Sequence, residues 1–184
     1  MSKKQSLREL QTRLAERMQQ VRTEQPGVSW LAVDCAGQGL LFALRQAGEI
    51  FKLGTLVPVP HTQPWLAGVV NQRGGLCTVV DLAAFLGLRS ADKPLSPLQC
   101  RVVGFNNELQ VNGALLVDRL EGLRHAADLI VETESADNGG DLQGAAAARP
   151  AFALARWRDE AGRVWQEIDL AELARLPQFL AVTD

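Results

Sequence analysis

Residues 68–82 of this 184-residue chain read Gly68-Val69-Val70-Asn71-Gln72-Arg73-Gly74-Gly75-Leu76-Cys77-Thr78-Val79-Val80-Asp81-Leu82. The paired valines on each side of the centre are β-branched and favour buried strands, and the Asn-x-Arg-Gly-Gly sequence between them is typical of a corner. Gly74-Gly75 supply the φ freedom that a tight reversal requires. The stretch therefore predicts a β-hairpin that carries one cation, Arg73, at its tip.

The residues after this hairpin predict a short helix over 82–86. Asp81 can cap its first turn, and Gly87 can take the left-handed conformation just past its end. A last helix is expected over 169–176, where Pro177 ends it. Apolar runs between turn residues predict strands at 30–35, 40–44, 99–105, 109–117, 152–157 and 164–168. Many short strands and little helix favour a mainly β fold built from barrels or a sandwich.

The first 25 residues follow a different pattern. Apolar residues recur there at helical spacing between charged ones, which predicts one amphipathic helix with a stripe formed by Leu7, Leu10, Leu14, Met18 and Val21. Either the β domain of this chain or a partner must cover the stripe, because exposed apolar stripes are unfavourable. Two further segments are expected to lack regular structure: a surface connection over 88–97 and a mobile loop over 132–148.

The composition limits the classes of protein to which this chain can belong. Apolar residues make up 47% of it, which is ample for a core, and the formal net charge is only −2. Without a basic stripe, a nucleic-acid partner is not expected. No run approaches the roughly 20 apolar residues of a spanning helix, and we expect neither a signal peptide nor direct membrane insertion. Cys35, Cys77 and Cys100 are expected to be buried free thiols in a reducing cytoplasm.

The sequence contains no constellation typical of catalysis or metal binding. His61 and His125 are isolated and are expected to be ordinary surface or partly buried side chains, and no HExxH or CxxC spacing is present. Gly37-Gln38-Gly39 precedes a strand instead of a helix, so it predicts no phosphate-binding loop. The four tryptophans are expected to pack in the core. We therefore expect no catalytic residue, no metal ion and no cofactor.

The hairpin and its flanks resemble the CheW-like adaptor domain of bacterial chemosensory systems. The residues that match the hairpin motif of that family are Gly68, Val69, Val70, Asn71, Arg73, Gly74, Val79, Asp81 and Leu82. Further matches occur in the family's order at Gly48-Glu49-Ile50, Val57-Pro58, Pro64-Trp65-Leu66, Leu116-Val117-Asp118 and 162–170. Gln72 and Thr78 depart from the pattern, which usually has Leu and Pro there. The resemblance covers residues 28–175.

This resemblance implies two small SH3-like β-barrels packed together, with an N-terminal amphipathic helix over 1–25 and a short C-terminal helix. Residues 26–180 would form a single CheW-like domain. One barrel would comprise about 26–90 plus a C-terminal strand or helix, and the other about 91–170. The barrels would exchange strands across the middle of the chain, with the changeover expected near Ser90.

The resemblance also implies a non-catalytic signalling adaptor that couples a methyl-accepting chemoreceptor to a CheA-type histidine kinase. Such an adaptor would be cytoplasmic and recruited to membrane-bound receptor complexes, with a higher-order signalling array as a further expectation. From the residues alone, Arg73 would be a solvated charge. The resemblance implies instead that Asn71, Gln72, Arg73, Gly74 and Gly75 contact a partner.

The N-terminal stripe, Trp65 and the ending 176–180 most resemble the PilI-type branch of the family, which serves twitching motility driven by type IV pili. Two alternatives stay open on the sequence. The chain could be a general CheW adaptor of flagellar chemotaxis, or a peptide-binding SH3-like module outside chemosensing. The second alternative would require a groove rich in aromatic residues, yet the chain has no Tyr, four Trp and six Phe.

Overall fold

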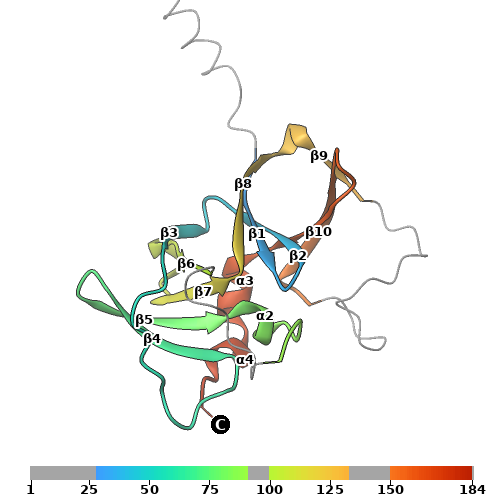
Figure 1. Ribbon diagram of the computed structural model, residues 1–184. Helices are drawn as coiled ribbons and strands as arrows, with labels where there is room; N and C mark the ends of the chain where they lie inside the picture. The colour runs from blue at the N-terminus through green and yellow to red at the C-terminus, as the bar shows by residue number, and fades with distance from the viewer. Residues whose placement is uncertain (1–27, 91–99, 133–149, 184) are drawn as a thin grey trace, which may run out of the picture.

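The computed structural model describes residues 28–90, 100–132 and 150–183. Within them the fold is mainly β, as predicted, and its two sheets form the two lobes of Figure 1, consistent with two SH3-like barrels. The helix predicted over 1–25 lies outside the described residues. So do residues 91–97 of the predicted connection and residues 133–148 of the predicted loop.

The two sheets contain six and five strands in the described residues. Sheet A has, in spatial order, β8 (Arg119–His125), β1 (Ser29–Cys35), β2 (Gln38–Ala43), β11 (Val164–Ile168), β10 (Ala153–Asp159) and β9 (Leu129–Val131). Sheet B has β3 (Ala47–Phe51), β6 (Arg101–Phe105), β7 (Gly113–Val117), β5 (Gly75–Asp81) and β4 (Leu66–Gln72). The short helices are α2 (Leu82–Phe85), α3 (Leu170–Arg175) and α4 (Pro177–Leu180), with 3-10 turns η1 (Asn107–Leu109) and η2 (Ala126–Asp128).

The chain begins sheet A, leaves it to build sheet B, and then returns. β1 and β2 start sheet A, β3 to β7 form sheet B, and β8 to β11 complete sheet A. Two parallel pairings belong to this path: β2 with β11, and β5 with β7. A boundary at Ser90 therefore does not separate the two sheets, because β6 and β7 follow Ser90 and pair with strands that precede it.

Both faces of β1 are buried, which explains its continuous apolar sequence. Leu31 packs in the core between the sheets, together with Leu115 of β7 and Leu170 of α3. The adjacent Trp30 points to the opposite face, where it packs with Trp165 in a cluster of sheet A. Both tryptophans are 1% exposed, whereas Trp65 and Trp157 are only partly buried, so the core prediction holds for two of the four tryptophans. A separate cluster within sheet B contains Val70, Cys77, Val79, Cys100, Val102, Ala114 and Leu116.

The predicted helix ends are confirmed. The Asp81 carboxylate accepts a hydrogen bond from the Ala84 backbone N–H at 3.1 Å, and Gly87, with a φ of 71°, follows the end of α2. Asp169 caps α3 in the same way. Pro177 ends α3 as predicted, but it also begins α4, because its fixed φ suits the first turn of a helix.

The predicted start of one strand was wrong. The strand expected over 109–117 begins only at Gly113. The Asn106 side chain accepts a hydrogen bond from the Glu108 N–H and starts the turn η1, and Gln110 then takes a left-handed φ of 55°. This local hydrogen bonding competes with strand pairing and delays the strand.

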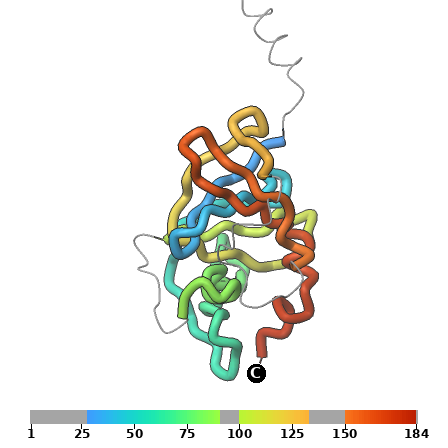
Figure 2. The backbone as a smooth tube through the Cα atoms, turned by 90° about the vertical axis from the view of Figure 1, so that its right-hand side faces the viewer, coloured from blue at the N-terminus to red at the C-terminus, as the bar shows by residue number. Residues whose placement is uncertain are grey.

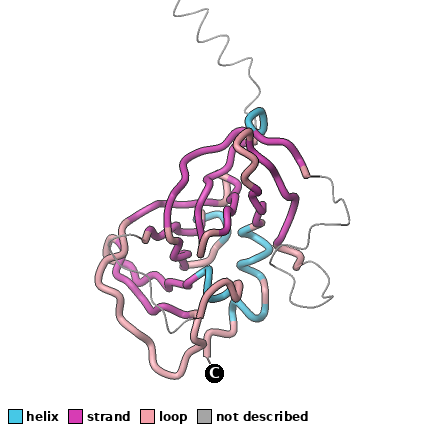
Figure 3. Tube along the Cα trace, turned by 45° about the vertical axis from the view of Figure 1, so that its right-hand side comes forward, coloured by secondary structure: helices cyan, strands magenta, loops and turns pink. Residues whose placement is uncertain are grey.

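The described chain begins and ends at opposite ends of the molecule. The blue start of the described chain lies at the outer end of sheet A, whereas α4 and the red C-terminal end lie beyond sheet B in both Figures 1 and 2. Helix α3 occupies the junction of the two groups of strands (Figure 3), where Leu170 and Leu173 are fully buried. The two sheets and α3 thus share one continuous core.

Candidate partner-binding surface

The β4–β5 hairpin reverses direction at Arg73 and Gly74. Gln72 pairs with Gly75, so Arg73 and Gly74 are the two central residues of the turn, with φ angles of 50° and 87°. Positive φ at both positions is the geometry of a type I′ turn, whose twist matches that of the strands. The sequence prediction placed the φ freedom at Gly74-Gly75. The strand register corrects it, because Gly75 already belongs to β5 and Arg73 takes the first left-handed position.

Two side-chain contacts hold this corner in place. The Asn71 Oδ1 atom accepts a hydrogen bond from the Gly74 backbone N–H at 2.9 Å. The Arg73 Nη2 atom donates to Glu49 Oε1 at 2.6 Å, which ties the hairpin tip to β3, an edge strand of sheet B. The two side chains are 79% and 42% exposed, and such pairs contribute only about 0–1 kcal/mol to stability. Arg73 can therefore exchange Glu49 for a partner at little cost in stability.

The five predicted contact residues lie together because they are consecutive at the tip. All are exposed except Gln72, which is partly buried. Sequence reasoning missed two neighbours: Glu49, whose contact with Arg73 joins separate strands, and Leu76, which is 67% exposed. An apolar residue beside the predicted tip was the signal that could have identified Leu76. We call Glu49 together with residues 71–76 the hairpin surface.

A polar cavity of about 330 Å³ adjoins the hairpin surface. Its lining includes Glu49, Gln72 and Gly75 of the hairpin surface, together with Asn107 and Asn112. The Asn112 side-chain amide donates to the Leu76 carbonyl oxygen, which connects the loop before β7 to the hairpin. The hairpin surface thus combines one cation, one carboxylate, two side-chain amides and one exposed leucine, which is a composition suited to contact with another protein.

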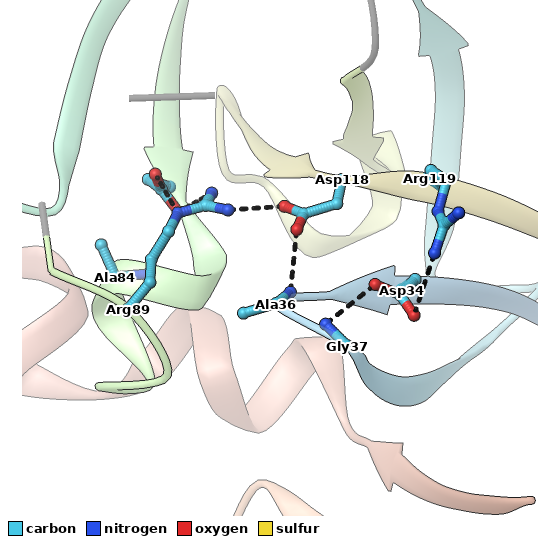
Figure 4. Close-up of polar contacts among 8 residues, drawn as sticks. Asp34, Ala36, Gly37, Ala84, Arg89, Asp118 and Arg119 are labelled. Atoms are coloured by element: carbon cyan, nitrogen blue, oxygen red, sulfur yellow. Dashed lines mark hydrogen bonds and ion pairs between the residues drawn. The ribbon is translucent and has the colours of Figure 1, made fainter. Parts of the chain in front are cut away.

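A second polar cluster joins the two sheets. Arg89, which follows α2, donates to Asp81 Oδ1 at 2.7 Å, to Asp81 Oδ2 at 3.3 Å and to Asp118 Oδ1 at 2.6 Å. Asp118 lies between β7 and β8, and its second oxygen accepts from the Ala36 backbone N–H in the β1–β2 turn at 2.9 Å (Figure 4). We call Arg89, Asp81, Asp118 and Ala36 the Arg89 network. It links the cap of α2 to the first hairpin of sheet A.

The charges of the Arg89 network are largely removed from solvent. The Arg89 and Asp81 side chains are each 12% exposed, and that of Asp118 is 21% exposed. Burial alone would lower the pKa of Arg89, but the hydrogen bonds and charges of Asp81 and Asp118 outweigh it and raise that pKa. The neighbouring Asp34 forms an ion pair with Arg119, drawn in Figure 4, and another with Arg163, so the turn of sheet A is held from several sides.

The three cysteines and the two histidines have surroundings typical of structural residues. Cys35, Cys77 and Cys100 are free and buried, as predicted, and burial raises the pKa of each thiol. Raised thiol pKa values oppose a nucleophilic role. His61 and His125 are exposed. Within residues 28–90, 100–132 and 150–183, no three His, Cys, Asp or Glu side chains are grouped to hold a metal ion. None of the helices in these ranges is long and apolar enough to cross a membrane.

The family model described as the CheW-like domain matches residues 29–178, which include both sheets, the hairpin surface and the Arg89 network. This chain belongs to the CheW-like domain family. The resemblance found in the sequence is thereby confirmed.

Two curated relatives and one solved structure are similar to this chain. Protein PilI of Pseudomonas aeruginosa is 33% identical over 101 residues, which cover 53% of this chain and 53% of PilI. Chemotaxis protein CheW of Thermotoga maritima is 27% identical over 93 residues, which cover 50% of this chain and 58% of that protein. The matches span only about half of each relative. The crystal structure of the scaffolding protein TtCheW from Thermoanaerobacter tengcongensis covers 83% of this chain and 95% of its own, with a TM-score of 0.63 and 16% identity, which supports the fold.

Proposed function

We propose that this chain is a non-catalytic adaptor that couples a methyl-accepting chemoreceptor to a CheA-type histidine kinase in a twitching-motility pathway. The observation that carries the proposal is the CheW-like match over 29–178 together with an ordered, exposed hairpin surface inside it. The adaptor would be cytoplasmic, would be recruited to receptors at the membrane, and would join a higher-order array. Asn71, Gln72, Arg73, Gly74 and Gly75 are its proposed contact residues.

The geometry of the hairpin surface suits a protein interface. The type I′ turn and the Asn71 hydrogen bond fix the backbone on which Arg73 stands. A preorganised tip loses less conformational entropy when a partner binds. The planar guanidinium can then form two parallel hydrogen bonds to a partner carboxylate, while Leu76 provides adjacent apolar area.

Coupling would then depend on a fixed distance between two contact regions. The shared core and the Arg89 network join sheets A and B into one body. A partner held at the hairpin surface of sheet B and another held on sheet A would keep a set separation. A conformational change of the receptor could therefore bias the kinase without any covalent step on the adaptor.

The choice between pathways rests on the relatives. The similarity to PilI, 33% over half of each chain, supports a role beside type IV pili. The similarity to the Thermotoga maritima chemotaxis protein supports the second candidate, a general adaptor of flagellar chemotaxis. The third candidate function is a peptide-binding module outside chemosensing. It would become the favoured function if no chemosensory kinase bound.

Binding to the purified regulatory domain of a CheA-type kinase from the same cell tests the proposal. We expect the wild type to bind and Arg73→Ala to bind at least tenfold more weakly while keeping the same circular dichroism spectrum. Arg175→Ala is the matched control, because Arg175 is 76% exposed and also paired with a glutamate. Equal binding by Arg73→Ala would contradict the role of the hairpin surface, and no binding by the wild type would contradict the adaptor function.

A further inference from the structure

The end of the β4–β5 hairpin projects beyond the rest of sheet B. Strand β5 pairs with β4 as far as the turn, where Gln72 faces Gly75. Its parallel pairing with β7 begins only at Thr78, opposite Gly113. On the β7 side, residues 75–77 therefore have no paired strand in the part of the chain that the structure describes. The hairpin surface stands on this projecting end, so its position depends on contacts other than strand pairing.

Side-chain packing gives the projecting end little support on one side. The cavity of about 330 Å³ that adjoins the hairpin surface is lined by Gln72, Gly75 and Cys77 of the hairpin, and also by Phe105 of β6 and Gly113 of β7. Space beside a strand removes the van der Waals contacts that would otherwise fix it. Hydrogen bonds therefore carry more of the task of holding the tip.

Asn112 extends the pairing of β5 toward the tip before β7 begins. Its backbone carbonyl oxygen accepts a hydrogen bond from the Thr78 N–H at 3.3 Å. Its side-chain Nδ2 atom donates to the Leu76 carbonyl oxygen at 2.5 Å, two residues closer to the tip. The amide of an asparagine side chain has the same donor chemistry as a backbone N–H. It therefore serves as one more ladder donor beside the projecting end.

The loop that carries Asn112 is itself anchored to the body of the protein. The Asn106 side chain accepts from the Glu108 N–H at 3.0 Å and donates to the Arg45 carbonyl oxygen at 2.8 Å. The Asn106 backbone N–H donates to the Gln46 carbonyl oxygen at 2.9 Å. Only residues 110–112 separate the anchored turn η1 from β7. Asn112 is thus a fixed point from which the hairpin can be held.

The contact of Asn112 also differs from that of Arg73 in what a partner would do to it. The Arg73–Glu49 pair is exposed and would be given up when Arg73 bonds to a carboxylate of the partner. The bond from Asn112 to Leu76 uses a backbone oxygen and needs neither Arg73 nor Glu49. It can therefore hold the tip in place while Arg73 changes its partner, which limits the conformational entropy lost on binding.

We propose that Asn112 is a positioning residue for the hairpin surface. Its amide holds the backbone at Leu76, and through it the turn that carries Arg73, in the orientation that the partner binds. This inference rests on the proposed function of the hairpin surface as a contact region. The loss of one neutral hydrogen bond of this kind corresponds to about threefold to tenfold weaker binding.

Two isosteric variants isolate the hydrogen bond. Asn112→Asp keeps the shape of the side chain but replaces the Nδ2 donor with an oxygen, and an ionised carboxylate cannot donate to the Leu76 carbonyl. Asn107→Asp is the matched control, because Asn107 is exposed, lines the same cavity and forms no side-chain hydrogen bond with any residue that the structure describes. Both variants add one negative charge to that cavity. If circular dichroism shows that Asn112→Asp is unfolded, Asn112→Ala and Asn107→Ala replace the pair.

The first measurement is hydrogen exchange of the Thr78 backbone amide in the free protein, followed by NMR. This amide bonds to the Asn112 backbone, which both variants keep, so its exchange reports how often the hairpin moves away from the start of β7. We expect exchange several times faster in Asn112→Asp and unchanged in Asn107→Asp. Equal exchange in the two variants would overturn the proposal without any reference to a partner.

The second measurement is binding to the regulatory domain of the CheA-type kinase, in the wild-type and Arg73→Ala backgrounds. Asn112→Asp should bind about threefold to tenfold more weakly than Asn107→Asp. In the Arg73→Ala background the same change should cost less than twofold, because the contact that Asn112 positions is already absent. An equal cost in both backgrounds would overturn the positioning role, since a general structural defect would give that result.

The outcomes separate this inference from the proposed function. A wild type that binds no such kinase overturns the proposed function, and the role of Asn112 in binding with it. A wild type that binds, with Asn112→Asp and Asn107→Asp binding equally well, overturns the role of Asn112 alone.

Discussion

Replacing Arg89 with methionine should lower the free energy of unfolding by about 3 kcal/mol. The change keeps most of the apolar stem but removes three hydrogen bonds to Asp81 and Asp118. Removing one partner of a buried ion pair typically destabilises a protein by about 3–5 kcal/mol, because the remaining charge is left uncompensated. The lower end applies here, since Asp81 and Asp118 each retain one backbone N–H donor and Asp118 is partly open to water.

The assay is urea unfolding followed by tryptophan fluorescence, with thermal unfolding as a second measure. A loss of about 3 kcal/mol corresponds to a fall of roughly 6–12 °C in Tm for a protein of this size. Arg175→Met is the control and should change stability by less than about 0.5 kcal/mol, because its ion pair is exposed. A loss below about 1 kcal/mol for Arg89→Met would refute the idea that this arginine joins the sheets.

Three other changes have measurable consequences. The Trp165 indole N–H holds the pKa of Asp159 below its ordinary value. The Asp159 carboxylate therefore stabilises the fold above the unfolded pKa of about 3.9, and this contribution is lost as pH falls through the lower pKa of the folded state. Asp159→Asn should therefore lose less stability than the wild type between about pH 5 and 2 in urea titrations, and parallel curves would contradict this. A thiol reagent such as dithionitrobenzoate should label none of the three cysteines before unfolding and all of them afterwards, because each is buried. Rapid labelling of the folded protein would contradict the burial of these thiols. Arg73→Ala should change the free energy of unfolding by less than about 1 kcal/mol in the same urea assay, since its pair with Glu49 is exposed, and a larger loss would mean that the pair is structural.

Much of the local structure could be predicted from the sequence. The hairpin over 68–82, the cap at Asp81 and the buried cysteines depend on neighbouring residues and on local hydrophobic pattern, and all are found. The family motif also located the tip that carries Arg73. These features are encoded within a few residues of where they occur, so a reading of the sequence reaches them.

The long-range features could not be predicted in the same way. The parallel pairing of β2 with β11 joins strands from opposite ends of the chain, and no local pattern specifies it. The contact of Arg73 with Glu49 and that of Arg89 with Asp118 likewise depend on which strands become neighbours. The left-handed φ of Arg73 was missed because the adjacent glycines suggested a turn one residue later, and only the strand register fixed its position.

The path of the chain through the two sheets has a consequence for synthesis. Strands β3 to β7, which make up sheet B, follow one another along the chain, so this sheet can close while the ribosome is still producing the remainder. β2 must wait for β11, which follows every other strand of the described residues, before its second edge is paired. Until then the β1–β2 hairpin exposes apolar side chains on both faces, and folding is slow because its partners are so distant in sequence. Nascent chains that stop before β11 should therefore contain a finished sheet B and an open, aggregation-prone β1–β2 hairpin.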